Sequence, residues 1–443
     1  MEKDQIERVY RGIPKKEHTQ GLMTRMNIKG RRALTLWGDV IRQIESRLEP
    51  LGSQEVLWEE AVGRVLAQPV TAPISLPSFA RAAMDGFALR SSDVHTASEE
   101  QPITLRVLGT AYPARPWSGV VSGGTTIRIM TGAALPEGAD TVVMFEDTEV
   151  SPDGQVVSIR RPSPPGRNVI AVGEDVMAGQ QVLPAGRVLR PQDVALLVAL
   201  GQTRCAVVRS PRVMLLVTGS ELVPPGVSPQ PGQIVDSNTP LLQALIPRDG
   251  GLVVEIQRKP DDLAILRATI RRALEWDIDV FLVSGGSSLG DEDFCPQVIA
   301  EMGEMVAHGL AIRPGTPTGL GWLFRPGKSL PVVLLPGNPV ACLVAYELLA
   351  GRIIRHLAGR PTDLPHCRVT LPLKEPWSSP AGRLEWVRVR IEQNQVVPLR
   401  QRGASSISSL VISDGFLLVP EEVTHYPAGT MVTVYLFDTT IRP

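Results

Sequence analysis

The sequence predicts a multidomain protein in which a doubly wound α/β domain is combined with a small β domain, a helical and extended linking domain, and a C-terminal β-barrel. At 443 residues the chain is too long for one hydrophobic core, so two to four domains are expected. Residues 211–358 alternate apolar strand-like runs with helical patterns, which is typical of an α/β domain. The flanking regions instead carry short strand-like runs separated by glycine- and proline-bearing turns.

The composition excludes several classes of protein. Hydrophobic residues make up 43% and charged residues 21%, which is ordinary for a soluble globular chain. The 45 basic and 46 acidic residues nearly cancel, which argues against a nucleic-acid binder. No apolar run approaches the roughly 18 residues of a membrane span, and the N-terminus lacks the apolar stretch of a secretory signal. The four cysteines form no CxxC pair, so a cytoplasmic protein without a disulfide framework is expected.

The N-terminal part is expected to hold a tail and a discontinuous linking domain. Residues 1–32 show no sustained periodicity, so they are treated as a tail. From Leu34 to Leu66 apolar residues recur at helical intervals. A second helix is predicted at Gln192–Leu200, with Gly201 placed to end it. Residues 33–77 and 169–207 are therefore assigned to one linking domain.

The segment between these two pieces, residues 78–168, is expected to form the small β domain. Glycine-bearing turns such as Pro152-Asp153-Gly154 separate its apolar runs. The strands are predicted at Ile103–Leu108, Thr125–Met130, Thr141–Phe145 and Gln155–Ile159.

The α/β domain is assigned to residues 208–360. Short continuous apolar runs such as Val213–Val217 are typical of parallel strands buried on both faces. Thr239 followed by Pro240 predicts the start of one helix, and either Asp261 or Asp262 is expected to cap the next. Further strands are predicted at Leu252–Ile256, Ile278–Val283 and Val332–Leu335, and a closing helix at Val340–Leu357.

Residues 361–443 return to short, evenly spaced strands, which favours a C-terminal barrel or sandwich. The strands are predicted at Arg368–Leu373, Leu384–Ile391, Phe416–Val419 and Met431–Leu436.

Three strand-to-helix junctions of the α/β domain carry the candidate chemistry, because open α/β sheets bind ligands where strands end and helices begin. The middle junction combines glycines, which let backbone N–H groups approach a ligand, with serine hydroxyls that can bind phosphate oxygens. Acids beside a phosphate would repel it unless a divalent cation intervened, and Mg²⁺ is the usual choice. The junctions read Thr218-Gly219-Ser220-Glu221, SGGSSLGDED at 284–293, and Pro336-Gly337-Asn338-Pro339.

Each junction also has a purely structural interpretation. Asp291 and Asp293 could serve only as helix caps, and Glu221 as a first-turn acid matched to its helix dipole. Asn338 followed by Pro339 is a normal way to begin a helix. What favours a ligand site is the expected convergence of all three on one edge of the sheet, which predicts a phosphate-bearing ligand.

Eight motifs, taken in order, resemble the molybdopterin molybdenumtransferase family, which is also represented by the C-terminal domain of gephyrin. The resemblance covers nearly the whole chain, from about residue 33 to 440. Any one motif is weak evidence, whereas eight in register are highly specific. They are SFARAAMDGFAL (78–89), RIMTGAALPEGADTVVMFED (128–147), GEDVMAGQQVLPAGRVL (173–189), VTGSEL (217–222), GQIVDSN (232–238), SGGSSLGDED (284–293), RPGTP (313–317) and LPGNPVA (335–341).

The resemblance implies a homodimer of elongated four-domain subunits with an α/β domain of the molybdopterin-binding type. It implies a cleft between the α/β domain of one subunit and the small β domain of the other. The implied reaction is Mg²⁺-dependent (or Zn²⁺-dependent) insertion of molybdate into adenylylated molybdopterin with release of AMP, the last step of molybdenum cofactor synthesis. The implied partners are small-molecule substrates and, transiently, the molybdopterin adenylyltransferase and apo-molybdoenzymes.

The resemblance also assigns residues to roles. The positions similar to the family's functional polar residues are Asp85, Thr131, Asp175, Glu221, Asp261 and Asp293, of which the first three would approach the cleft from the partner subunit's side. Asp261 is carried over less firmly, because the register around Asp261-Asp262 is ambiguous. The substrate-binding positions are Ser284, Gly285, Gly286, Ser288, Asp236, Asn238, Arg313, Pro314, Pro317, Gly337, Asn338 and Pro339. The metal is expected at Glu221, Asp291 and Asp293.

The chain departs from the family pattern at three positions. The family often carries lysines where this chain has Gly309 and Thr316, although Arg313 keeps a cation nearby. Arginine presents a fork of donors and lysine a point charge, so the geometry of an oxyanion site would differ. Ser220 replaces the acid that usually precedes Glu221, which affects the expected metal coordination.

Two other functions compete with this one. A non-catalytic molybdopterin or molybdate binder, or a scaffold, would explain the thinned set of lysines, but such a binder gains nothing from clustered carboxylates. A relative that shares only the α/β domain and adenylylates molybdopterin or hydrolyses another nucleotide would lack the flanking motifs at 78–89 and 128–147.

Overall fold

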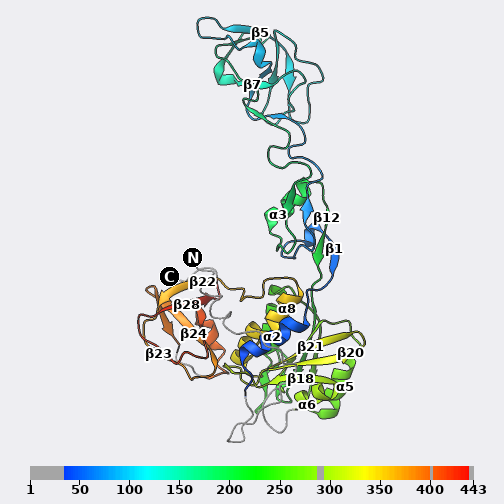
Figure 1. Cartoon of the computed structure of the whole chain (residues 1–443), viewed down its shortest axis with the longest axis vertical. Coiled ribbons are helices and arrows are strands. Elements are labelled where there is room, and N and C mark those ends of the chain that lie inside the picture. Colours follow the sequence, from blue (N-terminus) through cyan, green and yellow to red (C-terminus); the bar gives the residue numbers. More distant parts are fainter. Residues whose placement is uncertain (1–33, 287–293, 400–402, 439–443) are drawn as a thin grey trace. The chain divides into compact units, whose positions relative to one another are not determined.

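The computed structural model describes residues 34–286, 294–399 and 403–438. The chain divides into two compact units, one spanning Gly52–Arg209 and the other combining the residues up to Leu51 with those from Ser210 onward (Figure 1). Within the described ranges, no helix is both long and apolar enough to cross a membrane.

The α/β domain contains a six-stranded sheet of order β16-β13-β17-β21-β20-β18. The first four strands are parallel, whereas β20 pairs antiparallel with both β21 and β18, so the sheet is mixed. No strand was predicted over β20, since its glycines interrupt the apolar pattern. A Cβ on Gly303 would lie 1.9 Å from the carbonyl oxygen of Trp322, so β18 needs glycine there to approach β20. The strands are β16 (Leu252–Lys259), β13 (Arg212–Thr218), β17 (Val280–Ser284), β21 (Lys328–Leu335), β20 (Gly319–Arg325) and β18 (Gly303–His308).

Helices cover both faces of this sheet, which is the doubly wound arrangement that the sequence predicts. Alternate residues of β13 enter different cores, with Val213 and Leu215 in one and Met214 and Leu216 in the other. The second core is completed by α5 (Leu263–Ala273) and α6 (Phe294–Met302). The first core is completed by α2 (Trp37–Arg47), α4 (Asn238–Arg248), α7 (Pro339–Ala345), the π-helical segment η4 (Tyr346–Ala350) and α8 (Gly351–Leu357).

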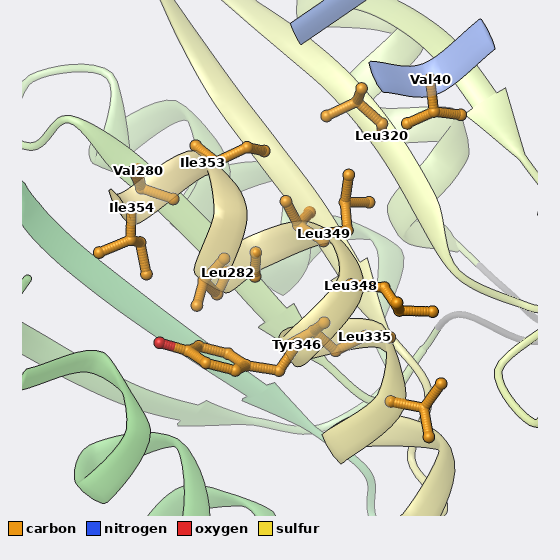
Figure 2. Close-up of a cluster of buried hydrophobic side chains, with 14 of the residues drawn as sticks. Val40, Val280, Leu282, Leu320, Leu335, Tyr346, Leu348, Leu349, Ile353 and Ile354 are labelled. Carbon is orange, nitrogen blue, oxygen red and sulfur yellow. The ribbon is translucent and has the colours of Figure 1, made fainter. Parts of the chain in front are cut away.

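Figure 2 shows the first core, in which side chains from distant parts of the sequence meet. Leu335 ends β21, Tyr346 lies in η4 and Val40 in α2, and all three are buried. Leu384, Trp386 and Phe416 of the C-terminal region belong to the same cluster. The α/β domain and the C-terminal sheet therefore share one hydrophobic core.

The predicted helical run from Leu34 to Leu66 is wrong beyond Arg47. Helix α2 ends there, and its C-cap Leu48 is extended. Pro50 follows, and a proline disfavours helical geometry in the residue before it. Residues Ser53–Leu57 instead form β1, which pairs antiparallel with β12 (Arg204–Val208).

At the starts of two helices, carboxylate side chains accept hydrogen bonds from backbone N–H groups. Helix α4 begins at Asn238 instead of after Thr239, because Asp236 accepts a hydrogen bond from the Thr239 N–H at 3.0 Å. Asp262 is the N-cap of α5 and accepts from the Ile265 N–H at 2.9 Å. Asp261 therefore does not cap this helix.

The C-terminal region forms a second six-stranded sheet, of order β19-β24-β26-β28-β22, with β25 pairing β24. An isolated bridge from Leu373 to Val396 links the end of β22 to β25 and curls the sheet on itself. A fully closed barrel stays a prediction. The elements are β19 (Ile312–Arg313), β22 (Arg368–Pro372), β24 (Leu384–Glu392), β25 (Gln395–Pro398), α9 (Ser408–Val411), β26 (Gly415–Val419) and β28 (Met431–Leu436), with the pair β23 (Trp377–Ser378) and β27 (His425–Tyr426).

The unit Gly52–Arg209 contains a six-stranded sheet of order β7-β4-β6-β5-β9-β8 and a smaller set of paired strands. All four strands predicted for residues 78–168 are present, and so is the helix α3 (Pro191–Ala199), which Gly201 follows with φ +79°. The sheet strands are β4 (Gly86–Leu89), β5 (Ile103–Ala111), β6 (Thr125–Ile129), β7 (Thr141–Met144), β8 (Thr148–Val150) and β9 (Val156–Ile159). The smaller strands are β2 (Val70–Thr71), β3 (Arg81–Ala82), β10 (Val169–Ile170) and β11 (Gln181–Leu183), and the 3₁₀ turns are η1 (Trp58–Glu60), η2 (Ser91–Asp93) and η3 (Phe145–Asp147).

Candidate active site

Asn238 joins two of the predicted junctions. Its side-chain Nδ2 donates to Ser284 Oγ at 3.0 Å, at the end of β17, and to the carbonyl oxygen of Gly337 at 2.9 Å, after β21. The side chain is buried, with 6% of its surface exposed. Because Asn238 is the first residue of α4, a helix start, a strand end and a turn distant in the sequence are held together by one amide.

At Gly285, the junction that begins with Thr218 lies against the other two. Its φ is +90°, and a Cβ at this position would lie 2.1 Å from the carbonyl oxygen of Thr218 at the end of β13. Only glycine permits this approach. The Gly285 N–H also donates to the carbonyl oxygen of Leu335 at 3.2 Å. The ends of three neighbouring parallel strands therefore meet at this glycine, as the sequence predicts.

Two carboxylates flank the end of β13. The hydroxyl of Thr218 donates to Asp261 Oδ1, whereas the neighbouring Asp262 caps α5. The Glu221 Oε2 lies 2.9 Å from the position that a Cβ on Gly219 would occupy, so this side chain folds back over the junction. Both acids are exposed, and their oxygens are therefore available to a ligand or a cation.

Asp236, a predicted binding residue, is instead engaged inside the protein. It is 2% exposed and accepts from the Thr239 N–H at 3.0 Å, the Thr239 hydroxyl at 2.5 Å and Arg258 Nε at 3.1 Å. These donors compensate the burial of its charge. Its observed contacts serve to begin helix α4 and to orient Arg258.

A hollow of about 240 Å³ opens beside the same strand ends. Sequence reasoning missed the two cations in its wall, Arg258 and Lys259, because the predicted strand stopped at Ile256. Strand β16 continues to Lys259, which pairs with Thr218, so both cations stand at the carboxyl edge of the sheet. The hollow is lined by Val217, Gly219, Ser220, Leu222, Arg258, Lys259 and Pro260.

Cys342 lies beside Ser284, beneath the site. It is fully buried in α7, and burial raises its thiol pKa to about 12 despite a hydrogen bond with Ser284. A thiol that stays protonated at neutral pH is a poor nucleophile and a poor metal ligand.

The remaining predicted binding residues of the α/β domain are more dispersed. Arg313 lies in β19, with its Nη1 3.5 Å from Glu385 Oε1 in the neighbouring strand β24. The segment after it, containing Pro314 and Pro317, approaches α7 at Gly315, whose Cβ position is 3.5 Å from the carbonyl oxygen of Ala341. Among the described residues, no hydrogen bond joins Arg313, Pro314 or Pro317 to Asn238 or to its partners.

The PGNP turn itself lies at the site. Gly337 and Asn338 are exposed, and Asn338 is the N-cap of α7 without a side-chain capping bond. Pro339 is the first residue of that helix, as predicted. Gly286 follows Gly285 with φ +55°, a second left-handed glycine in the middle junction.

Two of the predicted residues in the other unit are directly bonded to each other. The Thr131 N–H and hydroxyl donate to Asp85 Oδ1 at 2.7 and 2.8 Å. These bonds, the backbone one first, hold the pKa of the exposed Asp85 carboxyl below its ordinary value. Asp175 is also exposed, and its N–H donates to the carbonyl oxygen of Leu76.

The predicted metal site falls mainly outside the described residues, as do Ser288, Asp291 and Asp293. Among the residues that are described, no group of three or more His, Cys, Asp or Glu side chains is arranged to hold a metal ion. The donors that do lie at the site, Glu221 and Asp261, are exposed carboxylates. Such hard oxygen donors match the preference of Mg²⁺.

Three family models match the chain in succession. They are described as the MoeA N-terminal region, domains I and II (residues 37–201), a probable molybdopterin binding domain (214–356) and the MoeA C-terminal region, domain IV (370–437).

Known proteins agree with this succession over most of the chain. It is 34% identical to molybdopterin molybdenumtransferase 2 of Mycobacterium tuberculosis, covering 85% of this chain and 93% of that protein. It is 32% identical to the molybdopterin molybdenumtransferase of Haemophilus influenzae, covering 90% and 97%. A solved MoeA molybdopterin biosynthesis protein from Pyrococcus horikoshii superimposes with a TM-score of 0.79 at 33% identity, over 92% of this chain and all of that one. The chain therefore belongs to the MoeA family of molybdopterin molybdenumtransferases.

Proposed function

We propose that this protein is a molybdopterin molybdenumtransferase, which inserts molybdate into adenylylated molybdopterin and releases AMP. The observation that carries the proposal is the convergence of the ends of β13, β17 and β21 around Asn238 and Gly285. The relatives of this name from Mycobacterium tuberculosis and Haemophilus influenzae align over 85% and 90% of the chain. This combination favours chemistry on an anionic, phosphate-bearing substrate at the carboxyl edge of the sheet.

We assign phosphate binding to the glycines of the site and the spacing of its segments to Asn238. The left-handed glycines Gly285 and Gly286, with the exposed turn at Gly337, leave backbone groups accessible to phosphate oxygens. Asn238 fixes the spacing of these two segments through its amide.

Glu221 and Asp261, together with Asp291 and Asp293, would hold Mg²⁺ (or Zn²⁺). When bound, the cation would offset the negative charge of the phosphoanhydride as its P–O bond breaks. Thr218 supports this arrangement, because its hydroxyl donates to Asp261 and so orients the carboxylate.

The proposal includes a homodimer in which Asp85, Thr131 and Asp175 face the α/β domain of the partner subunit. The direct hydrogen bonds between Asp85 and Thr131 support treating them as one functional pair. It also includes the four-domain division assigned from sequence, with the difference that Trp37–Arg47 packs in the core of the α/β domain. A cytoplasmic location and transient contact with the adenylyltransferase and with apo-molybdoenzymes complete the proposal.

The test of the reaction supplies purified protein with adenylylated molybdopterin, Mg²⁺ and molybdate. AMP release that depends on the divalent ion, with transfer of active cofactor to an apo-molybdoenzyme, is the expected result. Tight substrate binding without AMP release would instead identify a non-catalytic binder of the same fold.

The shared cleft is tested by mixing two inactive variants. Glu221→Gln changes the α/β domain and Asp85→Asn the small β domain, so a heterodimer of the two contains one cleft with neither change. Co-expression is expected to restore AMP release that neither variant shows alone. Failure to restore it, with heterodimers present, would contradict a cleft formed across two subunits.

A further inference from the structure

The hollow beside β13 and β16 has a positively charged wall, although carboxylates lie at the same edge of the sheet. Its wall contains two ionisable side chains, Arg258 and Lys259, and both are cations. The carboxylates at the same edge, Glu221 and Asp261, do not line it. At the position before Glu221, where the resemblance leads one to expect an acid, the wall has Ser220, a neutral hydroxyl. An anion is the occupant that this wall favours.

The two cations differ in how far the protein already engages them. Arg258 donates from Nε to the buried Asp236 at 3.1 Å, which fixes its guanidinium while 39% of its side chain is exposed. Lys259 is partly buried, and within the described residues its ammonium forms no ion pair. One cation is therefore held in place and the other is available.

We infer that Arg258 and Lys259, with Ser220, form a binding site for a tetrahedral oxyanion in this hollow. A fixed guanidinium supplies directed donors, Lys259 supplies a point charge, and the Ser220 hydroxyl supplies a third donor. At about 240 Å³ the hollow is large enough for a phosphoryl group or molybdate, each of which carries oxygens at tetrahedral corners. The inference deepens the proposed function and rests on it for the identity of the substrate.

This site supplies positive charge at the edge of the sheet that carries the three junctions. Gly309 and Thr316 stand where the family often has lysines, and Arg313 is placed near Glu385 in the C-terminal sheet. The end of β16 supplies two cations at the edge of the sheet where the three junctions meet. The oxyanion is therefore bound from the β16 side of the site.

The test is direct binding of oxyanions to the purified full-length protein, measured by calorimetry at constant ionic strength. Inorganic phosphate, AMP and molybdate are titrated separately. Lys259→Ala is expected to weaken binding at least about tenfold, as for loss of one charge-assisted contact, and Lys259→Arg to restore most of it. The matched control is Lys374→Ala, which removes the same charge from an exposed lysine paired with Glu392 in the C-terminal region.

The three probes identify the source of the oxyanion. Lys259-dependent binding of phosphate and AMP assigns the hollow to a phosphoryl group, whereas Lys259-dependent binding of molybdate alone assigns it to the metal oxyanion. Equal affinities of the wild type, Lys259→Ala and Lys374→Ala for all three probes would overturn the inference. Because no turnover is needed, a protein that binds oxyanions through Lys259 yet releases no AMP would contradict the proposed function and leave this site standing.

Discussion

The two ends of helix α4 carry clusters of polar residues that are built in opposite ways. At its C-terminal end, Asp249 and Glu347 are 0% and 1% exposed, and arginines meet both of them. At its N-terminal end, Asn238 ties together segments whose neighbouring acids, Glu221 and Asp261, stay exposed. The charged groups of the first cluster pair with one another inside the protein, whereas the carboxylates of the second are accessible to a ligand.

The C-terminal cluster is a closed network. Arg248 contacts Glu347 at 2.6 Å and Asp249 at 2.9 Å, and Arg355 contacts Asp249 at 3.0 Å. His366 Nε2 lies 3.3 Å from Glu347 and extends the network to the segment before the C-terminal sheet. The comparison teaches that charge alone does not identify a functional site: burial with ion pairing indicates structure, and exposure at a sheet edge indicates ligand chemistry.

The largest effect is expected from breaking the closed network. Glu347→Ala removes the buried carboxylate that accepts two hydrogen bonds from Arg248, whose own side chain is 30% exposed and keeps Asp249 as a partner. Losing two charge-assisted hydrogen bonds should cost about 3 kcal/mol or more of folding free energy. Urea unfolding followed by tryptophan fluorescence measures it. The matched control is Glu301→Ala, which removes an equally bidentate but exposed partner of Arg267, and its unfolding midpoint should hardly move. Equal shifts for both variants would remove the distinction between the two kinds of charge.

A substitution at the N-terminal end of α4 should lower the turnover rate more than the stability. Asn238→Ala removes the amide that spaces Ser284 and Gly337, and misplacement of binding groups on this scale lowers turnover by about 100-fold. Its cost in stability should be smaller, about 1–3 kcal/mol, for the hydrogen-bonding groups left unpaired. Gln297→Ala, which removes an exposed amide on α6, is the control. A variant with normal AMP release would show that Asn238 is structural only.

The pH dependence of stability sharpens the same contrast. Burial alone would raise the pKa of Glu347, but the neighbouring His366 and Arg248 outweigh it and lower that pKa to about 2. Since the folded pKa is depressed, this stabilisation is complete above about pH 4.5, the ordinary value, and is lost as the pH falls toward 2. Glu347→Gln should flatten the decline in unfolding free energy over that window. An unchanged decline would assign the acid sensitivity to other carboxyls.

The smallest effect concerns an exposed carboxylate with one partner. Thr131→Val removes the side-chain donor to Asp85 and keeps the backbone one, so the Asp85 pKa should rise part of the way to its ordinary value. A carbon-detected NMR titration of the carboxyl measures this rise. If the pKa of Asp85 does not change, the Thr131 hydroxyl has no influence on it.

Much of the fold follows from local pattern, because burial in a parallel sheet leaves a continuous apolar run. The strands at 213–217 and 278–283 were found within two residues of their observed ends. The errors arise where tertiary contacts override local pattern: β1 forms because β12 pairs with it, and β20 was missed because its glycines hide the alternation. Helix α4 starts before Thr239, and the side chain of Asp236 accepts from the Thr239 N–H in its first turn.

The sequence predicts those features of the candidate site that depend only on residue type and on where the strands end. The convergence of Ser284, Gly285 and Gly337 follows from the rule for parallel strands. The sequence could not show which of Asp261 and Asp262 caps α5, because either acid can cap a helix. In the structure Asp262 accepts from the Ile265 N–H, and Asp261 accepts from Thr218. Asp236 is bound by Thr239 and by Arg258, and the predicted strand ended before Arg258, so its internal contacts were not predicted.

That adjacent pair of acids offers the most direct test of the central claim, that exposed carboxylates at the carboxyl edge of the sheet act on the substrate. Asp261→Asn and Asp262→Asn remove the same charge from neighbouring exposed positions, and asparagine caps a helix about as well as aspartate. Mg²⁺-dependent AMP release should be lost in Asp261→Asn and preserved in Asp262→Asn. Equal AMP release by the two variants would contradict the account.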